Sequence, residues 1–128
     1  DGRILRRPVA GFSSAVDTTT WTTTLHDRGE AYEVAFLDGT NVNPGYRLVS
    51  NRFYPEISDD YRATFERLST LEPKPRIWFA HHSEFDDFAL RRDRAAREGV
   101  SGWVNGDTYL NWVAERRGKF DAALKRQQ

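Results

Sequence analysis

The fold class of this chain is decided by residues 57–82, ISDDYRATFERLSTLEPKPRIWFAHH. Apolar side chains recur there at helical spacing, at positions 57, 61, 65, 68 and 71, which predicts an amphipathic helix over roughly 58–71. Ser58 or Asp59 can cap the start of this helix, and Pro73 lies just past its end. The apolar run from Arg76 to Ala80 follows a Pro-Lys-Pro loop and predicts a short buried strand.

Two further helices are expected after this strand. Residues 86–98 are rich in alanine, arginine and aspartate, and Gly99 supplies a stop signal. Asp107 can cap a third helix, whose apolar side chains share one face: Tyr109, Trp112, Val113, Phe120 and Leu124. Gly118 weakens the middle of this helix by about 1 kcal/mol relative to alanine.

Strands are expected before residue 57. Residues 18–25 are β-branched and aromatic, which favours a strand, and the polar residues 26–30 indicate a hairpin loop. Residues 31–37 form a second strand, whose imperfect alternation is typical of a strand covered on both faces. Ile4 to Pro8 is a candidate edge strand. A hairpin followed by helix, strand and helix predicts an α/β fold with a mixed sheet.

Composition excludes several classes of protein. The chain has 128 residues, enough for one domain with its own core, and its 19 basic residues balance its 19 acidic ones. We therefore expect no general affinity for nucleic acid or for an anionic membrane, and no apolar stretch approaches the ~20 residues of a membrane span. The absence of cysteine excludes disulfides and thiolate metal sites. The chain starts at Asp1 and has no methionine, so we expect a processed or trimmed chain, or a piece of a longer one.

Two adjacent histidines, His81 and His82, follow the predicted strand 76–80. Loops after the strands of open α/β sheets converge on ligand sites, and neutral histidine is the commonest metal ligand. Adjacent side chains leave an extended backbone in opposite directions, so at most one of the two faces a given site. The pair is therefore a candidate metal site, with ordinary polar surface as the alternative.

Several other side chains admit both a chemical and a structural interpretation. Glu84, Asp86 and Asp87 could bind metal or act as bases, but the start of the next helix is the simpler place for the two aspartates. Asp38 ends a predicted strand and is either a metal-bridging carboxylate or the first residue of an Asp-Gly turn. His26 is expected to be a solvated surface histidine. The sequence shows no phosphate loop, serine elbow or His-x-Glu signature.

Beyond these single residues, blocks of sequence resemble the C-terminal half of class B metallo-β-lactamases. The closest group is the third subclass, which uses histidines and an aspartate as zinc ligands and no cysteine. The similarity spans about residues 17–125, in blocks that occur in the family's order. The blocks are Thr19-Thr20-Trp21-Thr22, Asn43 to Leu48, Tyr54-Pro55, Asp60-Tyr61, Thr64-Phe65 with Leu68, Ala80-His81, Trp103-Val104 with Asp107 and Tyr109, and Phe120 with Leu124.

The resemblance implies one half of a four-layer αββα sandwich, formed by residues 1–128 with a poorly defined lead-in over 1–17. It implies zinc as cofactor, a β-lactam-like small molecule as substrate, a role in antibiotic resistance, and a periplasmic or secreted location. His81 matches the family's last zinc-binding histidine, in its Ala-His context. Thr40 falls near a family serine that helps to bind the substrate carboxylate, and threonine keeps the hydroxyl.

The departures from the family concern the metal. The first metal motif, His-x-His-x-Asp-His, belongs to the N-terminal half and does not occur in this chain. The middle zinc histidine is also missing, because residues 11–17 read GFSSAVD; Phe12 and Ser14 cannot replace an imidazole, and Asp17 is a remote candidate. A catalytic zinc needs about three protein ligands, whereas only His81 survives. We therefore expect a single chain not to hydrolyse lactams.

Two functions follow, and a third drops the resemblance. The chain is either part of a zinc hydrolase completed by an N-terminal half, or a non-catalytic half domain that acts as a homodimeric structural or binding module. A second copy could cover the apolar sheet face that a lone half exposes. The third interpretation is a small α/β binding protein with an aromatic pocket, although core positions explain its tryptophans better: Trp21, Trp78, Trp103 and Trp112.

Overall fold

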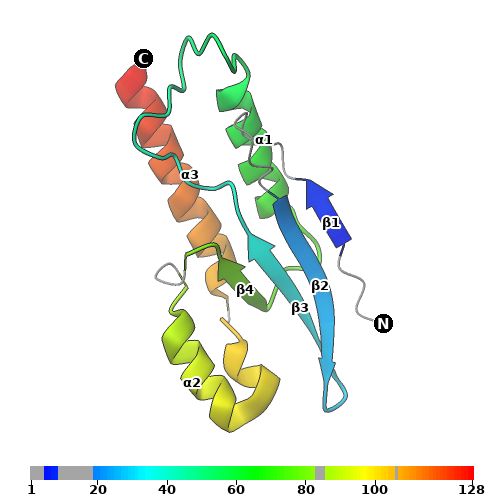
Figure 1. The fold of residues 1–128 in the computed structure, drawn as a ribbon. Helices are drawn as coiled ribbons and strands as arrows, with labels where there is room; N and C mark the ends of the chain where they lie inside the picture. Colours follow the sequence, from blue (N-terminus) through cyan, green and yellow to red (C-terminus); the bar gives the residue numbers. More distant parts are fainter. Residues whose placement is uncertain (1–4, 9–18, 83–85, 106) are drawn as a thin grey trace.

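Helices and strands follow the predicted order in a computed structural model, which describes residues 5–8, 19–82, 86–105 and 107–128 (Figure 1). The strands are β1 (Leu5–Pro8), β2 (Thr19–Asp27), β3 (Glu30–Leu37) and β4 (Ile77–Ala80). The helices are α1 (Ile57–Ser69), α2 (Phe88–Glu98) and α3 (Thr108–Gln127), and a 3-10 helix, η2 (Gly99–Trp103), follows α2. The predicted α/β class is confirmed.

The strands form one mixed sheet in the order β1-β2-β3-β4. β2 pairs antiparallel with β1 and β3, whereas β3 and β4 are parallel. The expected edge strand is confirmed over Leu5–Pro8. The hairpin loop is shorter than predicted, because Arg28 and Gly29 alone form the turn, with φ of 51° and 80°. Two positive φ values fit a type I′ turn, which matches the strand twist. His26 pairs with Ala31 inside the hairpin and is exposed, as expected of a surface histidine.

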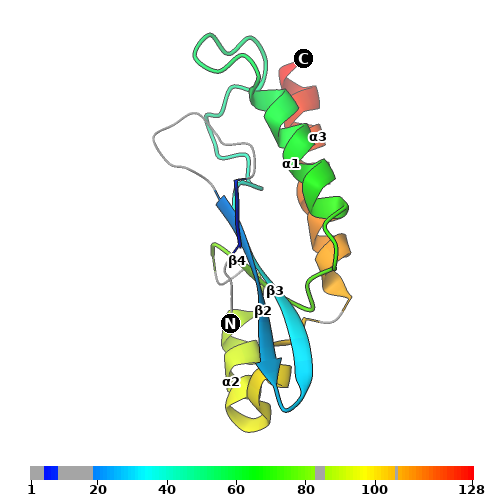
Figure 2. The ribbon, with the colours of Figure 1, turned by 90° about the vertical axis from the view of Figure 1, so that its right-hand side faces the viewer.

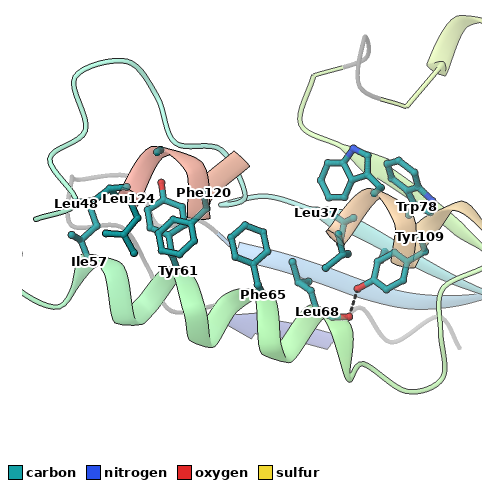
Figure 3. Packing of buried hydrophobic residues seen from close by; sticks show 14 residues of the cluster. Leu37, Leu48, Ile57, Tyr61, Phe65, Leu68, Trp78, Tyr109, Phe120 and Leu124 are labelled. Atoms are coloured by element: carbon teal, nitrogen blue, oxygen red, sulfur yellow. Dashed lines mark hydrogen bonds between the residues drawn. The ribbon is translucent and has the colours of Figure 1, made fainter. Parts of the chain in front are cut away.

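Helices α1 and α3 pack on one face of the sheet, which we call the covered face (Figure 2). The predicted apolar stripe of α1 is buried there, with Tyr61 and Phe65 at 0% exposure. Figure 3 shows these rings between α1 and Phe120 of α3, and the Tyr61 and Phe120 ring centroids are 5.0 Å apart. The buried Tyr109 hydroxyl donates to the Leu68 carbonyl at 2.7 Å. The chain thus completes a core on this face.

The opposite face is only partly covered. Near η2, a small cluster buries Tyr32, Val34 and Ile77. Beyond it, the strand register aligns Trp21, Phe36 and Phe79 in one row across β2, β3 and β4. Trp21 is 37% exposed, Phe36 45% and Leu25, on the same side of β2, 43%. We call Trp21, Leu25, Phe36 and Phe79 the open face. The expectation that every tryptophan is a core residue is therefore wrong for Trp21, whereas Trp78 and Trp112 are buried.

Arginines attach α2 to this partly covered face. Arg91 is 4% exposed; it donates to the Trp103 carbonyl at 2.7 Å, and its guanidinium carbon lies 4.7 Å from the Phe79 ring centroid. Arg94 donates to the Gly102 carbonyl at 2.7 Å. Gly102 lies so close to α2 that a Cβ at its position would be 2.4 Å from the Ala95 Cα. The α2–η2 unit is therefore held by polar contacts and close backbone approach more than by apolar burial.

The expected helix caps are not formed. Helix α1 begins at Ile57, and the Ser58 hydroxyl donates instead to the Leu48 carbonyl at 2.6 Å. Asp107 stands at the N-cap of α3, but its side chain makes no capping hydrogen bond. Tertiary contacts thus use the Ser58 hydroxyl that the local pattern assigned to the helix terminus.

Asn105 closes the free edge of β4. Its side-chain amide accepts from the Trp78 amide at 3.0 Å and donates to the Trp78 carbonyl at 3.2 Å. Its own backbone amide donates to the Arg76 carbonyl at 3.0 Å. One asparagine therefore supplies β4 with the hydrogen bonds that a further strand would make. Among the described residues, no helix is both long and apolar enough to cross a membrane.

Candidate functional site

Asp38 and His81 lie side by side at one edge of the sheet. β3 and β4 are parallel neighbours, and their last residues, Leu37 and Ala80, are register partners. The next residue of each segment therefore leaves the sheet at the same edge, where ligand sites of α/β sheets form. The sequence predicted each residue at a strand end, and the parallel register brings the two together.

Among the described residues, the His81 imidazole lies close to the side chains of Asp38, Asn41 and His82. Its Nδ1 lies 3.7 Å from Asp38 Oδ1, its Nε2 lies 3.5 Å from the Asn41 amide nitrogen, and its ring centroid lies 4.3 Å from that of His82. The side chains of His81 and Asp38 are 29% and 38% exposed, so solvent reaches the site. A neutral ring with its proton on Nδ1 fits both contacts, because Nδ1 then faces a carboxylate and Nε2 faces a donor.

The electrostatic surroundings favour neutral imidazole. Burial lowers the pKa of His81 below its usual value of 6.5; the Asp38 carboxylate opposes this shift, and the charges of His82 and Arg116 add to it. At pH 7 the ring is therefore unprotonated, which is the form that coordinates a metal. The role of His81 as a zinc ligand remains a prediction.

Asp38 and Thr40, two further candidate site residues, differ in their hydrogen bonds. Asp38 Oδ1 accepts from the Gly39 amide at 2.7 Å, and the chain bends at Gly39; the role of Asp38 as a metal bridge stays a prediction. Thr40 is 2% exposed, and its hydroxyl has no hydrogen-bond partner among the described residues. Substrate binding by Thr40 also stays a prediction.

The Asp86 carboxylate, which follows β4, has a structural role. Asp86 is 5% exposed; it accepts from the Ala80 amide at 2.9 Å and lies 3.8 Å from the Arg91 guanidinium. Burial raises the pKa of Asp86, and its hydrogen bonds from the Ala80 and Phe88 amides and the charge of Arg91 counter that effect. Helix α2 begins at Phe88, because Asp87 has a left-handed φ of 52°, so the predicted start at residue 86 is two residues early. Glu84 lies outside the described residues.

The described residues do not form a zinc site by themselves. His81 and Asp38 are potential ligands, but no group of three or more histidine, aspartate or glutamate side chains in the described ranges could hold a metal ion. A catalytic zinc takes three protein ligands and keeps a fourth position for water. The predicted deficit at residues 11–17 lies outside the described residues. The described residues therefore offer fewer potential ligands than a catalytic zinc needs.

Asn41 and Arg116, which lie near His81, were not predicted as site residues. Asn41 contacts His81 and accepts from Arg116 Nη1 at 3.1 Å. Arg116 is 7% exposed in α3, one helical turn from both Trp112 and Phe120. A charged residue inside the apolar stripe of a helix was the available signal for a buried arginine. Asn41 had no comparable signal, because its place depends on the path of the loop.

Similarity to known structures places this geometry in a known fold. FEZ-1 metallo-β-lactamase from Legionella gormanii matches with a TM-score of 0.87 and 25% identity, over 98% of this chain and 47% of that one. BJP-1, a subclass B3 metallo-β-lactamase of Bradyrhizobium japonicum, matches with a TM-score of 0.82 and 24% identity, over 99% and 46% of the two chains. A metallo-β-lactamase from Cronobacter sakazakii has a TM-score of 0.78 and 26% identity, over 97% and 45%.

The chain has the metallo-β-lactamase fold, and it corresponds to the C-terminal half of the subclass B3 domain. It spans about half the length of the solved enzymes that it matches. No protein-family model matches the chain, and no curated protein matches it by sequence.

Proposed function

We propose that this chain acts as the C-terminal half of a zinc-dependent hydrolase of β-lactam-like amides, and that it is inactive by itself. The observation that carries the proposal is the pairing of His81 with Asp38 at the strand-end edge of a half sandwich. One imidazole and one carboxylate are too few for a catalytic zinc, so the remaining ligands must come from an N-terminal half.

Within such a complete site, the two residues have different tasks. His81 offers Nε2 as a metal ligand once the Asn41 amide moves away, since the two nitrogens are 3.5 Å apart. Asp38 faces Nδ1 and keeps the ring in the tautomer whose Nε2 is unprotonated, as a carboxylate behind a metal-binding histidine does. A bound zinc would supply the activated water for amide hydrolysis.

The open face supports the need for a second half. Trp21 and Phe36 are more than one third exposed, although both lie in strands of the sheet. Phe36 stacks on Phe79 at 5.2 Å, so the exposed row is an ordered apolar surface. A second sheet packed on it would bury this row and complete a sandwich.

A reconstitution experiment tests the proposal. The chain is mixed with zinc and with the part of FEZ-1 that it does not match, and hydrolysis of nitrocefin and bound zinc are measured. We expect no hydrolysis by the chain alone and hydrolysis by the assembled pair, with weaker zinc binding than in FEZ-1 because residues 11–17 lack a histidine.

Adjacent histidines provide the matched variants for this experiment. His81→Ala should abolish the hydrolysis restored in the pair, while His82→Ala, which changes an exposed neighbour, should retain most of it. An assembled pair that hydrolyses no lactam, or one that is indifferent to His81→Ala, would overturn the proposal. The family resemblance also suggests a periplasmic or secreted location, which fractionation of the producing cell tests.

The second candidate function is a homodimeric binding module, favoured by the exposure of Phe36 at 45%. Light scattering of the chain alone distinguishes the two. In a homodimer built on the open face, Phe36→Ser should release monomers. Phe53→Ser, which alters a side chain that is 97% exposed in a loop, should leave the dimer intact. A stable monomer at high concentration counts against this second function.

A further inference from the structure

A second concave site lies beside the candidate metal edge. A cavity of about 410 Å³ is formed between the loop over residues 40–43 and α3. We call it the basic cavity; its polar lining residues are Thr40, Asn41, Asn43, Arg116, Lys119 and Arg126. Figure 1 shows the segment after β3 running to α3, and Gln127 ties the two by accepting from the Leu48 amide at 2.7 Å. The cavity volume falls in the range of small-molecule sites.

The cavity concentrates positive charge. Arg116, Lys119 and Arg126 are three and seven residues apart, so α3 presents them on one side. None of the described residues that line the cavity is acidic. Lys119 also pairs with Glu115 at 2.7 Å, but that pair is more than half exposed on both sides, and exposed pairs are weak enough for a ligand to compete.

Arg116 is held in place by its neighbours. Its side chain is 7% exposed, Nη1 donates to Asn41 Oδ1 at 3.1 Å, and the guanidinium carbon lies 5.2 Å from the Trp112 ring centroid. Burying a cation costs free energy unless polar or anionic groups compensate it. A fixed guanidinium presents its donors in a rigid fork that suits an oxyanion.

Thr40 adds an independent observation. The residue lines the cavity, its exposure is 2%, and its hydroxyl has no hydrogen-bond partner among the described residues. Buried hydroxyls are usually hydrogen-bonded. The hydroxyls of Thr20 and Thr64 are also unpartnered among the described residues, but of the three threonines only Thr40 lines this cavity. An oxyanion seated in the cavity would accept the hydrogen bond that Thr40 can donate.

We propose that the basic cavity binds a phosphate-type dianion, either free or as the phosphate group of a small molecule. Three cations line the cavity, and no carboxylate does so among the described residues, which favours a doubly charged anion over a monocarboxylate. Arg116 and Thr40 are buried residues of its lining, and Lys119 and Arg126 are exposed ones. Asn41 contacts both Arg116 and His81, so an occupied cavity fixes the loop that borders the candidate metal edge.

The test uses the chain without zinc, so its outcome is separate from the fate of the proposed hydrolase. Inorganic phosphate is titrated at constant ionic strength, and backbone amide shifts of α3 are followed by NMR. We expect saturable binding, with acetate several-fold weaker. Lys119→Ala and Arg126→Ala should each weaken phosphate binding about three- to fivefold, the scale of an exposed charge contact.

Lys125→Ala is the matched control, because Lys125 is exposed on the same helix but does not line the cavity. It should change phosphate affinity less than twofold. Saturable binding that is lost with Lys119 and Arg126 but not with Lys125 supports the site. Weakening by Lys125→Ala equal to that of Arg126→Ala, or no saturation by phosphate, overturns it. A phosphomonoester such as phosphoserine that binds more tightly than phosphate would identify the ligand as a substituted phosphate.

Discussion

The covered and open faces of the sheet differ in what the chain itself supplies. On the covered face, two helices bury Tyr61 and Phe65 completely. On the open face, α2 and η2 reach only part of the strands, and Phe36 stays 45% exposed. The same four strands therefore carry both a finished core and an unfinished one. The chain therefore buries its main core on one face of the sheet and leaves an exposed apolar row on the other, where we propose that a second sheet packs.

The largest expected effect contrasts two phenylalanines, one on each face. Phe65→Ala should lower the free energy of unfolding by about 4 kcal/mol, because it leaves a cavity in the covered core. Phe36→Ala should cost less than about 1 kcal/mol in a monomer, because its ring is already partly in water. Urea unfolding monitored by tryptophan fluorescence measures both. Equal losses would mean that the two faces are buried alike in solution.

The next effect tests how α2 is attached. Arg91→Ala should cost about 3 kcal/mol, because it leaves the Asp86 carboxylate buried without its cation. Arg92→Ala, on the same helix, removes an exposed pair with Asp93 and should cost less than about 0.5 kcal/mol. Chemical denaturation compares the two. If Arg91→Ala and Arg92→Ala lowered the free energy of unfolding equally, the buried pair of Arg91 with Asp86 would not be what attaches α2 to the sheet.

Two glycines give effects of opposite sign. Gly102→Ala should destabilise the chain by about 2 kcal/mol, since the added Cβ would meet the α2 backbone 2.4 Å away. Gly118→Ala should stabilise it by up to about 1 kcal/mol, because a Cβ there meets nothing within 4 Å and alanine favours helix. Thermal unfolding of the two variants measures whether each substitution raises or lowers the stability. If Gly102→Ala left the stability unchanged, η2 would be able to move away from α2.

The smallest effect concerns Asp38 and His81, at the edge of the sheet where β3 and β4 end. Asp38→Asn should lower the pKa of His81 further, because the carboxylate is the group that raises it against burial. NMR titration of the His81 ring measures this shift, and a rise would contradict the assigned contact. Because the folded chain binds this proton less tightly than the unfolded chain, His81 removes stability as the pH falls below about 6.5.

Much of this fold follows from residue patterns, while the candidate site does so only in part. The spacing of Ile57, Tyr61 and Phe65 predicts α1 and its buried side, because helical periodicity can be read from one short stretch of sequence. The strand ends at Asp38 and His81 were also predictable. Their contact was not, since it depends on the parallel register of β3 and β4, which pairs Leu37 with Ala80 across a long stretch of sequence.

Two other errors have similar causes. Trp21 fits a core residue by type, but whether a sheet face is covered depends on segments far away in the sequence. Ser58 fits a helix cap, yet the Leu48 carbonyl ten residues earlier accepts its hydroxyl instead. Local propensity indicates which roles a residue favours, and tertiary contacts determine which of these roles it has in the fold.

The amide of Asn105 has a further consequence for how copies of this chain can aggregate. Exposed strand edges are templates for the strand addition that builds fibrils. With the Trp78 amide and carbonyl already bonded to Asn105, an incoming strand finds no complementary row along the middle of β4. Growth of the sheet into a ribbon is thereby blocked on that side. Asn105→Ala would reopen this edge, and fibril formation rather than lost folding would be its signature.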